Sequence, residues 1–128
     1  MSENTGPEHP PVSRHEAEAG SEPVALGELA ETLCADLSNH PAGRTARTVM
    51  SGPRMRAVVI AMRDGAEMAE HESPPAATLY VIKGQVTLKG EGREWTLDAG
   101  SLVPIPPHRH SVEAHADSAF LLTVALTP

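Results

Sequence analysis

The sequence contains few aromatic residues, with one Phe, one Trp and one Tyr among its 128 residues. A hydrophobic core must therefore be built from Val, Leu, Ile, Ala and Met. The scarcity argues against an aromatic cage for a cationic ligand. It argues equally against a stacking platform for nucleotide bases. The residues that carry the function must be of other types.

Cysteine is almost absent too, since Cys34 is the one thiol in the chain. No disulfide can form within the chain, and we expect Cys34 to be a small packed hydrophobic residue rather than a reactive thiol. No stretch approaches the roughly 18 apolar residues of a membrane span. The N-terminus is rich in Glu and Pro and does not resemble a signal peptide. We therefore expect a cytoplasmic protein that does not bind membranes.

Positive charge is in deficit, because the formal net charge is -7. This balance argues against non-specific binding to nucleic acid. Much of the acidity lies in residues 1–22, which contain five Glu against one Arg and show no apolar periodicity. Such a segment cannot bury enough apolar surface to offset the entropy of ordering. We therefore predict a disordered acidic tail over 1–22.

An amphipathic helix is predicted next, within a segment of helix and linker that spans residues 23–44. Leu26, Leu29, Leu33 and Leu37 recur at steps of three and four residues, which places them on one face of a helix. The Ser-Asn-His-Pro run at 38–41 should end this helix.

From residue 45 to 128 the pattern changes to short strands separated by turn residues. Strands at such even spacing indicate an all-β sandwich or barrel rather than βαβ units. The nine predicted strands are Thr45–Met50, Met55–Met62, Glu67–Glu70, Thr78–Lys83, Gln85–Lys89, Arg93–Leu97, Leu102–Ile105, Arg109–Ala114 and Ala119–Leu126.

The glycine spacing is more informative than any single strand. Gly65, Gly84 and Gly100 punctuate the chain around the run YVIKGQV, and WTLDAGSLVPIPP then leads to His110. From about residue 55 to 126 this order resembles the cupin superfamily. The resemblance implies a double-stranded β-helix (jelly-roll) barrel preceded by the short helix and the disordered tail. It also implies a homodimer.

The resemblance further implies a metal position inside the barrel. Cupins that bind a metal use three histidines and one carboxylate to hold Fe, Mn, Zn or Ni. His71 and His110 occupy two of the four positions, whereas Ser73 and Ala77 occupy the other histidine position and the carboxylate position. An open metal site normally needs about three protein ligands. The chain keeps only two of the family's four.

His108 is the candidate third ligand, because it lies two residues before His110; the alternative is a histidine at the rim. Alternation along a strand places His71 on the same face as Glu67 and Ser73. Glu67 is a poor substitute ligand, since four residues at ~3.3 Å each separate it from His71 by about 13 Å.

The predicted pocket is mostly apolar and contains two histidines and a serine, which suits a small molecule. We expect Arg56, Arg63 and Arg109 to be surface charges rather than a clamp for a substrate. The residues predicted to line the pocket are His71, Ser73, Ala77, Leu79, Val81, Val86, Leu88, His110 and Val112.

Three functions remain open at this point, and the last of them is a purely structural or partner-binding dimer. The first is a cupin that binds a small, apolar or weakly acidic molecule in its pocket without catalysis, with a divalent metal held weakly or not at all at His71 and His110. The second is a metal-dependent cupin enzyme of the dioxygenase, isomerase or decarboxylase type. The absent second histidine and carboxylate favour the first, and the retained histidines favour the second.

Overall fold

The computed structural model describes residues 22–71 and 74–126, and it confirms an all-β jelly-roll barrel with one short α-helix. The tail predicted over 1–22 lies outside the described residues apart from Glu22, and so does Ser73. The helices are α2 (Leu26–Ala35) and the 3₁₀ turn η1 (Leu37–Asn39). The strands are β1 (Arg44–Ser51), β2 (Met55–Met62), β3 (Glu67–His71), β4 (Ala77–Lys83), β5 (Gln85–Gly90), β6 (Arg93–Asp98), β7 (Leu102–Pro104), β8 (His110–Ala114) and β9 (Ser118–Ala125).

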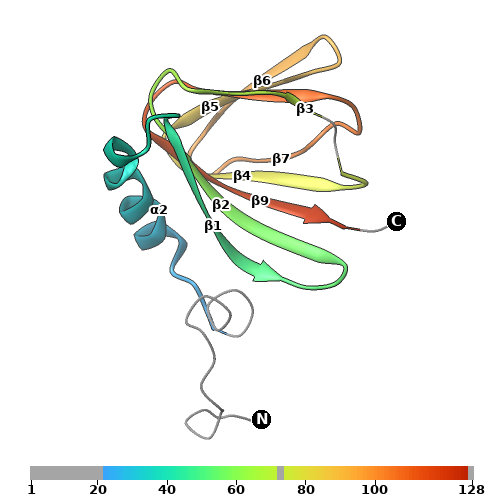
Figure 1. Cartoon of the computed structure of the whole chain (residues 1–128). Coiled ribbons are helices and arrows are strands. Elements are labelled where there is room, and N and C mark those ends of the chain that lie inside the picture. The colour runs from blue at the N-terminus through green and yellow to red at the C-terminus, as the bar shows by residue number, and fades with distance from the viewer. Residues whose placement is uncertain (1–21, 72–73, 127–128) are drawn as a thin grey trace, which may run out of the picture.

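These strands form two antiparallel sheets that face one another, as Figure 1 shows. One sheet has five strands in the order β1-β2-β9-β4-β7, and the other has four in the order β3-β8-β5-β6. Neighbouring strands are mostly distant in sequence, as with β2 and β9. The barrel therefore depends on long-range pairing rather than on hairpins alone.

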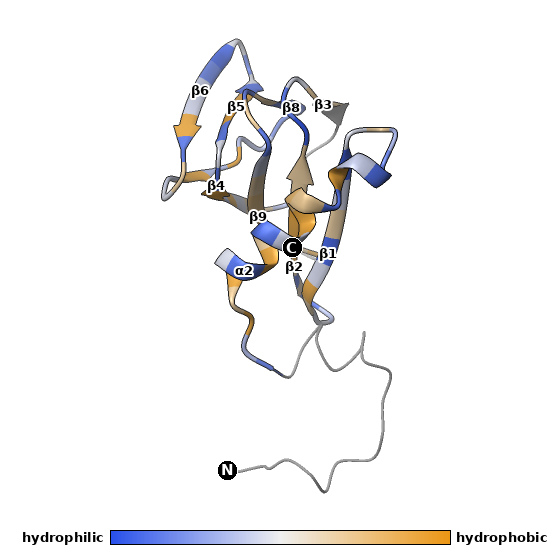
Figure 2. Ribbon diagram, turned by 90° about the vertical axis from the view of Figure 1, so that its left-hand side faces the viewer, coloured by the Kyte–Doolittle hydropathy of each residue, from blue (hydrophilic) through white to orange (hydrophobic). Residues whose placement is uncertain are grey.

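The core lies between the two sheets and follows from the alternation of side chains along each strand. In β2, Ile60 and Met62 belong to the buried cluster between the sheets, and Val58 packs against it. The intervening Val59 and Ala61 belong to a second cluster on the opposite face. Both faces of β2 are therefore apolar, because both are covered. Figure 2 shows this apolar character along β2 and the mixed polar and apolar character of α2.

Helix α2 covers the outer face of the five-stranded sheet (Figure 1). Leu29, Leu33 and Leu37 are buried against β2 and β9, as their spacing predicted. Arg63 holds the end of this segment, because its guanidinium donates to the carbonyls of Leu37 at 2.9 Å and His40 at 3.1 Å. The prediction of Arg63 as a surface charge is wrong: its side chain is half-buried and its donors serve the chain after α2.

The interior of the barrel is closed at one end. Met62, Val81, Val86, Ala114 and Phe120 face the interior at this end and are fully buried. The closure is tight at Gly84, where a Cβ would lie 2.2 Å from the Ser118 hydroxyl oxygen. Gly84 also adopts a φ of +84°, which favours glycine.

The opposite end is less covered, and we call it the open end. It lies where β2 begins and β9 ends, and where β3 leads into β4. Here the interior positions Val58, Ala77 and Leu122 are only half-buried, and Arg56 is exposed. Solvent therefore reaches the inner face from this end.

Candidate functional site at the open end

His71 and His110 lie directly across from one another at the open end. Strands β3 and β8 pair in register with Glu67 opposite Glu113 and Met68 opposite Val112. An irregularity then follows, after which His71 is the Cα partner of His110. Cα atoms of directly paired antiparallel residues are about 4.5–5.5 Å apart.

This irregularity corrects the predicted alternation of β3. Glu67 is exposed, whereas Met68 packs against the interior cluster. Between Met68 and His71 the strand has one residue more than its partner, as in a β-bulge. His71 therefore takes the register position opposite buried His110 rather than continuing the face of Glu67. The prediction that Glu67 and His71 share a face is wrong for this reason.

The His110 imidazole is buried and held in one orientation. The residue is 3% exposed and lies on the same face of β8 as Val112 and Ala114. Its Nδ1 lies 3.1 Å from the main-chain carbonyl oxygen of His108. A carbonyl can only accept a hydrogen bond, so Nδ1 carries the proton in this contact. In the neutral ring Nε2 is then the nitrogen with the lone pair.

The strand next to His110 approaches it closely. Gly90 is the Cα partner of His110 in the pairing of β5 with β8. A Cβ at Gly90 would lie 3.2 Å from the Arg109 carbonyl oxygen and 3.3 Å from the His110 Cβ. A glycine therefore allows β8 to begin this close to the β5–β6 hairpin.

The His108 ring does not join His110. Its side chain is 64% exposed, and its Nε2 forms an ion pair with the Glu91 carboxylate. His108 thus contributes its carbonyl oxygen to His110, and its ring binds Glu91 in the hairpin between β5 and β6. The suggestion of His108 as a third metal ligand is not supported by this arrangement.

Glu91 has an unusual backbone conformation, with a φ of +57°. Among the described residues it is the only non-glycine residue with positive φ. Gly92 follows with a φ of +72°, so the two residues form a tight hairpin loop of the kind that usually contains Asn-Gly. For a residue with a Cβ this conformation costs about 1–2 kcal/mol. Glu91, the residue in this unfavourable backbone conformation, is also the residue whose carboxylate binds the His108 ring.

The apolar residues predicted to line the pocket all reach the inner faces of the sheets. Leu79, Val81, Val86, Leu88 and Val112 belong to the buried cluster between the sheets. Ala77 is half-buried at the open end and packs against the same cluster. Val81 and Val86 lie at the closed end as core residues. Ala77 and His110 lie where a molecule could enter.

The described residues do not supply a complete metal site. Within 22–71 and 74–126, no group of three or more His, Cys, Asp or Glu side chains is arranged to hold an ion. Ala77, at the family's carboxylate position, has no donor atom, and the His108 ring is engaged by Glu91. The donor set therefore does not fit the four-ligand cupin centre.

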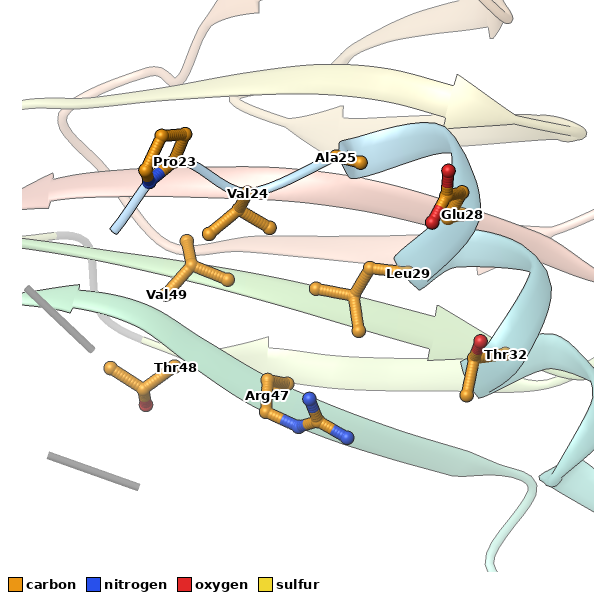
Figure 3. A pocket seen from close by; sticks show the side chains of 9 residues that line it. All are labelled: Pro23, Val24, Ala25, Glu28, Leu29, Thr32, Arg47, Thr48 and Val49. Atoms are coloured by element: carbon orange, nitrogen blue, oxygen red, sulfur yellow. The ribbon is translucent and has the colours of Figure 1, made fainter. Parts of the chain in front are cut away.

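Two further hollows lie outside the barrel interior. A cavity of about 300 Å³ separates the start of α2 from β1, and Figure 3 shows Val24, Leu29 and Val49 gathered in it. A shallower, mostly apolar groove of about 440 Å³ lies at the open end of the five-stranded sheet, among Arg54, Met55 and Pro104. Neither hollow is lined by a histidine, and no sequence motif pointed to either of them.

Arg56, predicted to be a surface charge, lies at the open end. It occupies the face of β2 that also carries Val58, Ile60 and Met62. The alternation within the run MRAVVIAM contains this signal, since Arg56 stands two residues before Val58.

Comparison with known proteins agrees with this architecture. Residues 58–125, more than half of the chain, match the sequence model of a family described as "Cupin domain". None of the curated proteins matches the chain significantly. No helix among the described residues is long and apolar enough to cross a membrane.

Several solved structures share the fold at low sequence identity. A cupin superfamily protein from Desulfitobacterium hafniense superposes with a TM-score of 0.68 at 13% identity, covering 83% of this chain and 92% of its own. A conserved protein of unknown function from Streptococcus pyogenes gives 0.62 at 19% identity, covering 70% and 78%. KdgF from Halomonas sp. gives 0.58 at 21% identity, covering 67% and 82%.

Proposed function

The chain belongs to the cupin family, and we propose that it binds a small molecule in the interior of its barrel, at the open end beside His71 and His110. The observation that carries the proposal is the His110 ring. It is a buried imidazole, fixed through Nδ1, on a face that is otherwise apolar and at the end that solvent reaches. Small-molecule sites typically combine such apolar walls with a few placed polar groups.

His110 supplies the polar chemistry of the proposed site. It places a polar ring on an otherwise apolar wall, and the His108 carbonyl fixes the orientation of that ring through Nδ1. Polar contacts are stronger in a low-dielectric interior than in water. An apolar molecule with one polar group would therefore be oriented by this ring and held by the surrounding aliphatic side chains.

The alternative is a metal-dependent cupin enzyme, and the register of His71 opposite His110 favours it. Two imidazoles at directly paired positions can share one divalent ion. With Ala77 at the carboxylate position, water or the substrate would have to complete the coordination. Such an ion would act as a Lewis acid on a bound oxygen.

Elemental analysis separates these two functions. The protein is purified without added metal, beside His71→Ala and His110→Ala variants and a matched His115→Ala control. His115 suits the control because its ring is exposed on the outer face and bound to Thr87. We expect no stoichiometric metal in any of the four proteins, and no binding when Fe, Mn, Zn or Ni is titrated. About one metal per chain, lost in the first two variants and kept in His115→Ala, would instead establish the metal centre.

We further propose that the protein is a cytoplasmic homodimer. Three large apolar side chains on or beside the five-stranded sheet support an interface there, since Leu102 is 60%, Met55 42% and Leu126 37% exposed. The apolar groove at Met55 extends the same surface. Light scattering tests the oligomeric state: a dimer that dissociates in Leu102→Glu supports the interface, and a monomeric wild-type protein overturns it.

A further inference from the structure

We infer that the ligand of this site is an anion with an apolar body, of the class of small monocarboxylates, and that Arg56 binds its charged group. The inference rests on the proposed function and adds the chemistry of the ligand to it. It is drawn from the position of Arg56 in β2, from its lack of a partner among residues 22–71 and 74–126, and from the cations at the open end of the barrel.

Arg56 lies on the inner face of the barrel. The pairing of β2 with β9 runs without irregularity from Met55 opposite Ala125 to Met62 opposite Ser118. Alternation along β2 is therefore unbroken, and Arg56 shares the face of Val58 and Ile60 that meets the interior cluster. Arginine is the exception on a face that is otherwise apolar.

Arg56 also lies in one row with a residue of the proposed site. Val124 in β9 is the Cα partner of Arg56 on one side and of Ala77 on the other. Neighbouring strands are about 4.8 Å apart, so Arg56 and Ala77 are separated by roughly 10 Å across the sheet. The long guanidinium side chain can span much of that distance.

The row formed by Arg56, Val124 and Ala77 lies at the same end of the barrel as His110. Five residues separate His71, at the end of β3, from Ala77 at the start of β4. The Ile105 amide donates to the Ala77 carbonyl at 2.9 Å, and the chain reaches His110 five residues later. Arg56 and His110 therefore lie on opposing sheets at the same end of the interior.

The guanidinium of Arg56 has no partner among the described residues. No hydrogen bond, ion pair or ring contact involves it within 22–71 and 74–126, and its side chain is exposed. Other arginines of the barrel are engaged: Arg63 binds two carbonyls, and Arg93 lies 4.7 Å above the Trp95 ring centre. The planar guanidinium can bind a carboxylate through two parallel hydrogen bonds.

Cations gather around Arg56 at the open end of the barrel. At the open end Glu91 is already paired with His108, and Glu94 is the other described acidic side chain there. The described cations of the open end are Arg54, Arg56, Arg93 and Arg109. Cations at the mouth of a low-dielectric interior attract anions.

The walls behind Arg56 define the rest of the ligand. Val58, Ala77 and Leu122 are the half-buried interior positions nearest the open end, and none of the three has a polar side-chain atom. A ligand bound at Arg56 through its carboxylate would place its remaining atoms against them. That arrangement suits an aliphatic or aromatic carboxylate better than a sugar or a nucleotide.

Matched acid and amide probes test the inference. Benzoate against benzamide and hexanoate against hexanamide are titrated into ¹⁵N-labelled full-length protein, and the amide shifts of Val58, Leu122 and His110 are followed. We expect each acid to bind at least ten-fold more tightly than its amide at low salt. This preference should fall to near unity in Arg56→Ala and be partly kept in Arg56→Lys. It should stay unchanged in Arg54→Ala, which removes a charge at the same end but outside the inner face.

The outcomes distinguish this inference from the proposed function. Equal binding of acid and amide, or an acid preference that survives in Arg56→Ala, overturns the role of Arg56 and leaves the interior site standing. If neither member of either pair shifts the inner-face amides, both the ligand class and the interior site are refuted. Binding of acids that disappears equally in Arg54→Ala and Arg56→Ala would reduce the effect to general surface charge and overturn the assignment.

Discussion

The Glu91 carboxylate forms an ion pair with the His108 imidazole, and the main-chain carbonyl of His108 accepts a hydrogen bond from Nδ1 of buried His110. A hairpin loop on the surface is thereby linked to the central imidazole of the proposed site. The link passes through a residue that holds a left-handed backbone conformation at φ +57°. Glu91 therefore has a part in the site that its exposed position does not reveal.

Replacing Glu91 by Asn should change how the His110 ring is held and leave the stability of the fold nearly unchanged. Asn-Gly suits the hairpin loop better than Glu-Gly, and the exposed ion pair contributes only about 0–1 kcal/mol. The free energy of unfolding should therefore stay within about 1 kcal/mol of the wild type. The His110 ring should lose its single Nδ1-protonated form, which ¹H–¹⁵N spectra of the histidine rings report. Glu94→Gln is the control, and an unchanged His110 tautomer in Glu91→Asn would show that the ion pair does not position the ring.

Gly84→Ala should destabilise the closed end of the barrel. A Cβ would lie 2.2 Å from the Ser118 hydroxyl oxygen and 2.8 Å from the Asp117 carbonyl oxygen, at a φ of +84°. Overpacking and the left-handed conformation together predict a loss of about 2–4 kcal/mol in urea unfolding. Gly92→Ala is the matched control, because its φ is +72° and nothing lies within 4 Å of the added Cβ. Equal losses in the two variants would mean that conformation alone, rather than contact with Ser118, requires the glycine.

Because of Cys34, the free energy of unfolding should decrease at alkaline pH. Burial raises the pKa of the thiol above its ordinary value of 9.0. A group whose pKa is higher in the folded state stabilises the fold below the unfolded pKa, and this contribution is lost as the pH rises through the folded pKa. The free energy of unfolding should therefore fall above about pH 9 relative to a Cys34→Ala variant. Iodoacetamide should modify the native thiol slowly, and parallel pH profiles for the two proteins would contradict the assignment.

Arg63→Met should loosen the end of α2. The variant keeps an apolar side chain but no donors, so the carbonyls of Leu37 and His40 lose their partner. A loss of about 1–3 kcal/mol in unfolding free energy is expected. Hydrogen exchange should quicken in η1 and in the last turn of α2. Arg44→Met, at an exposed position of β1, is the control, and equal exchange in both variants would argue against the bracing role of Arg63.

Much of the barrel could be predicted from sequence because its strands are marked locally. In β2 and β4 apolar residues alternate between two covered faces, and the glycine and proline turns separate them clearly. The helix followed in the same way from its leucine stripe. These patterns are set by residues within a few positions of one another, so they can be recognised in the sequence before the fold is known.

The site was less predictable, because it is formed by residues far apart in sequence. The predicted face of His71 was wrong because the strand is irregular between Met68 and His71. This irregularity depends on pairing with β8, about forty residues later. His108 was separated from the site by its contact with Glu91, across the hairpin. Neither the extra residue in β3 nor that contact leaves a recognisable mark in the local pattern.

Local sequence patterns specified the strands, the helix and the residue types of the proposed site. They indicated a cupin-like barrel, two retained histidines, and Ala77 where a carboxylate stands in metal-binding relatives. The tertiary structure decided which of these residues meet. It set His71 across from His110, turned the His108 ring to Glu91, and placed Arg56 on the inner face in one row with Ala77. Hydrogen bonds and packing between distant strands fix the register and the facing of each residue, and these interactions exist only once the barrel has closed.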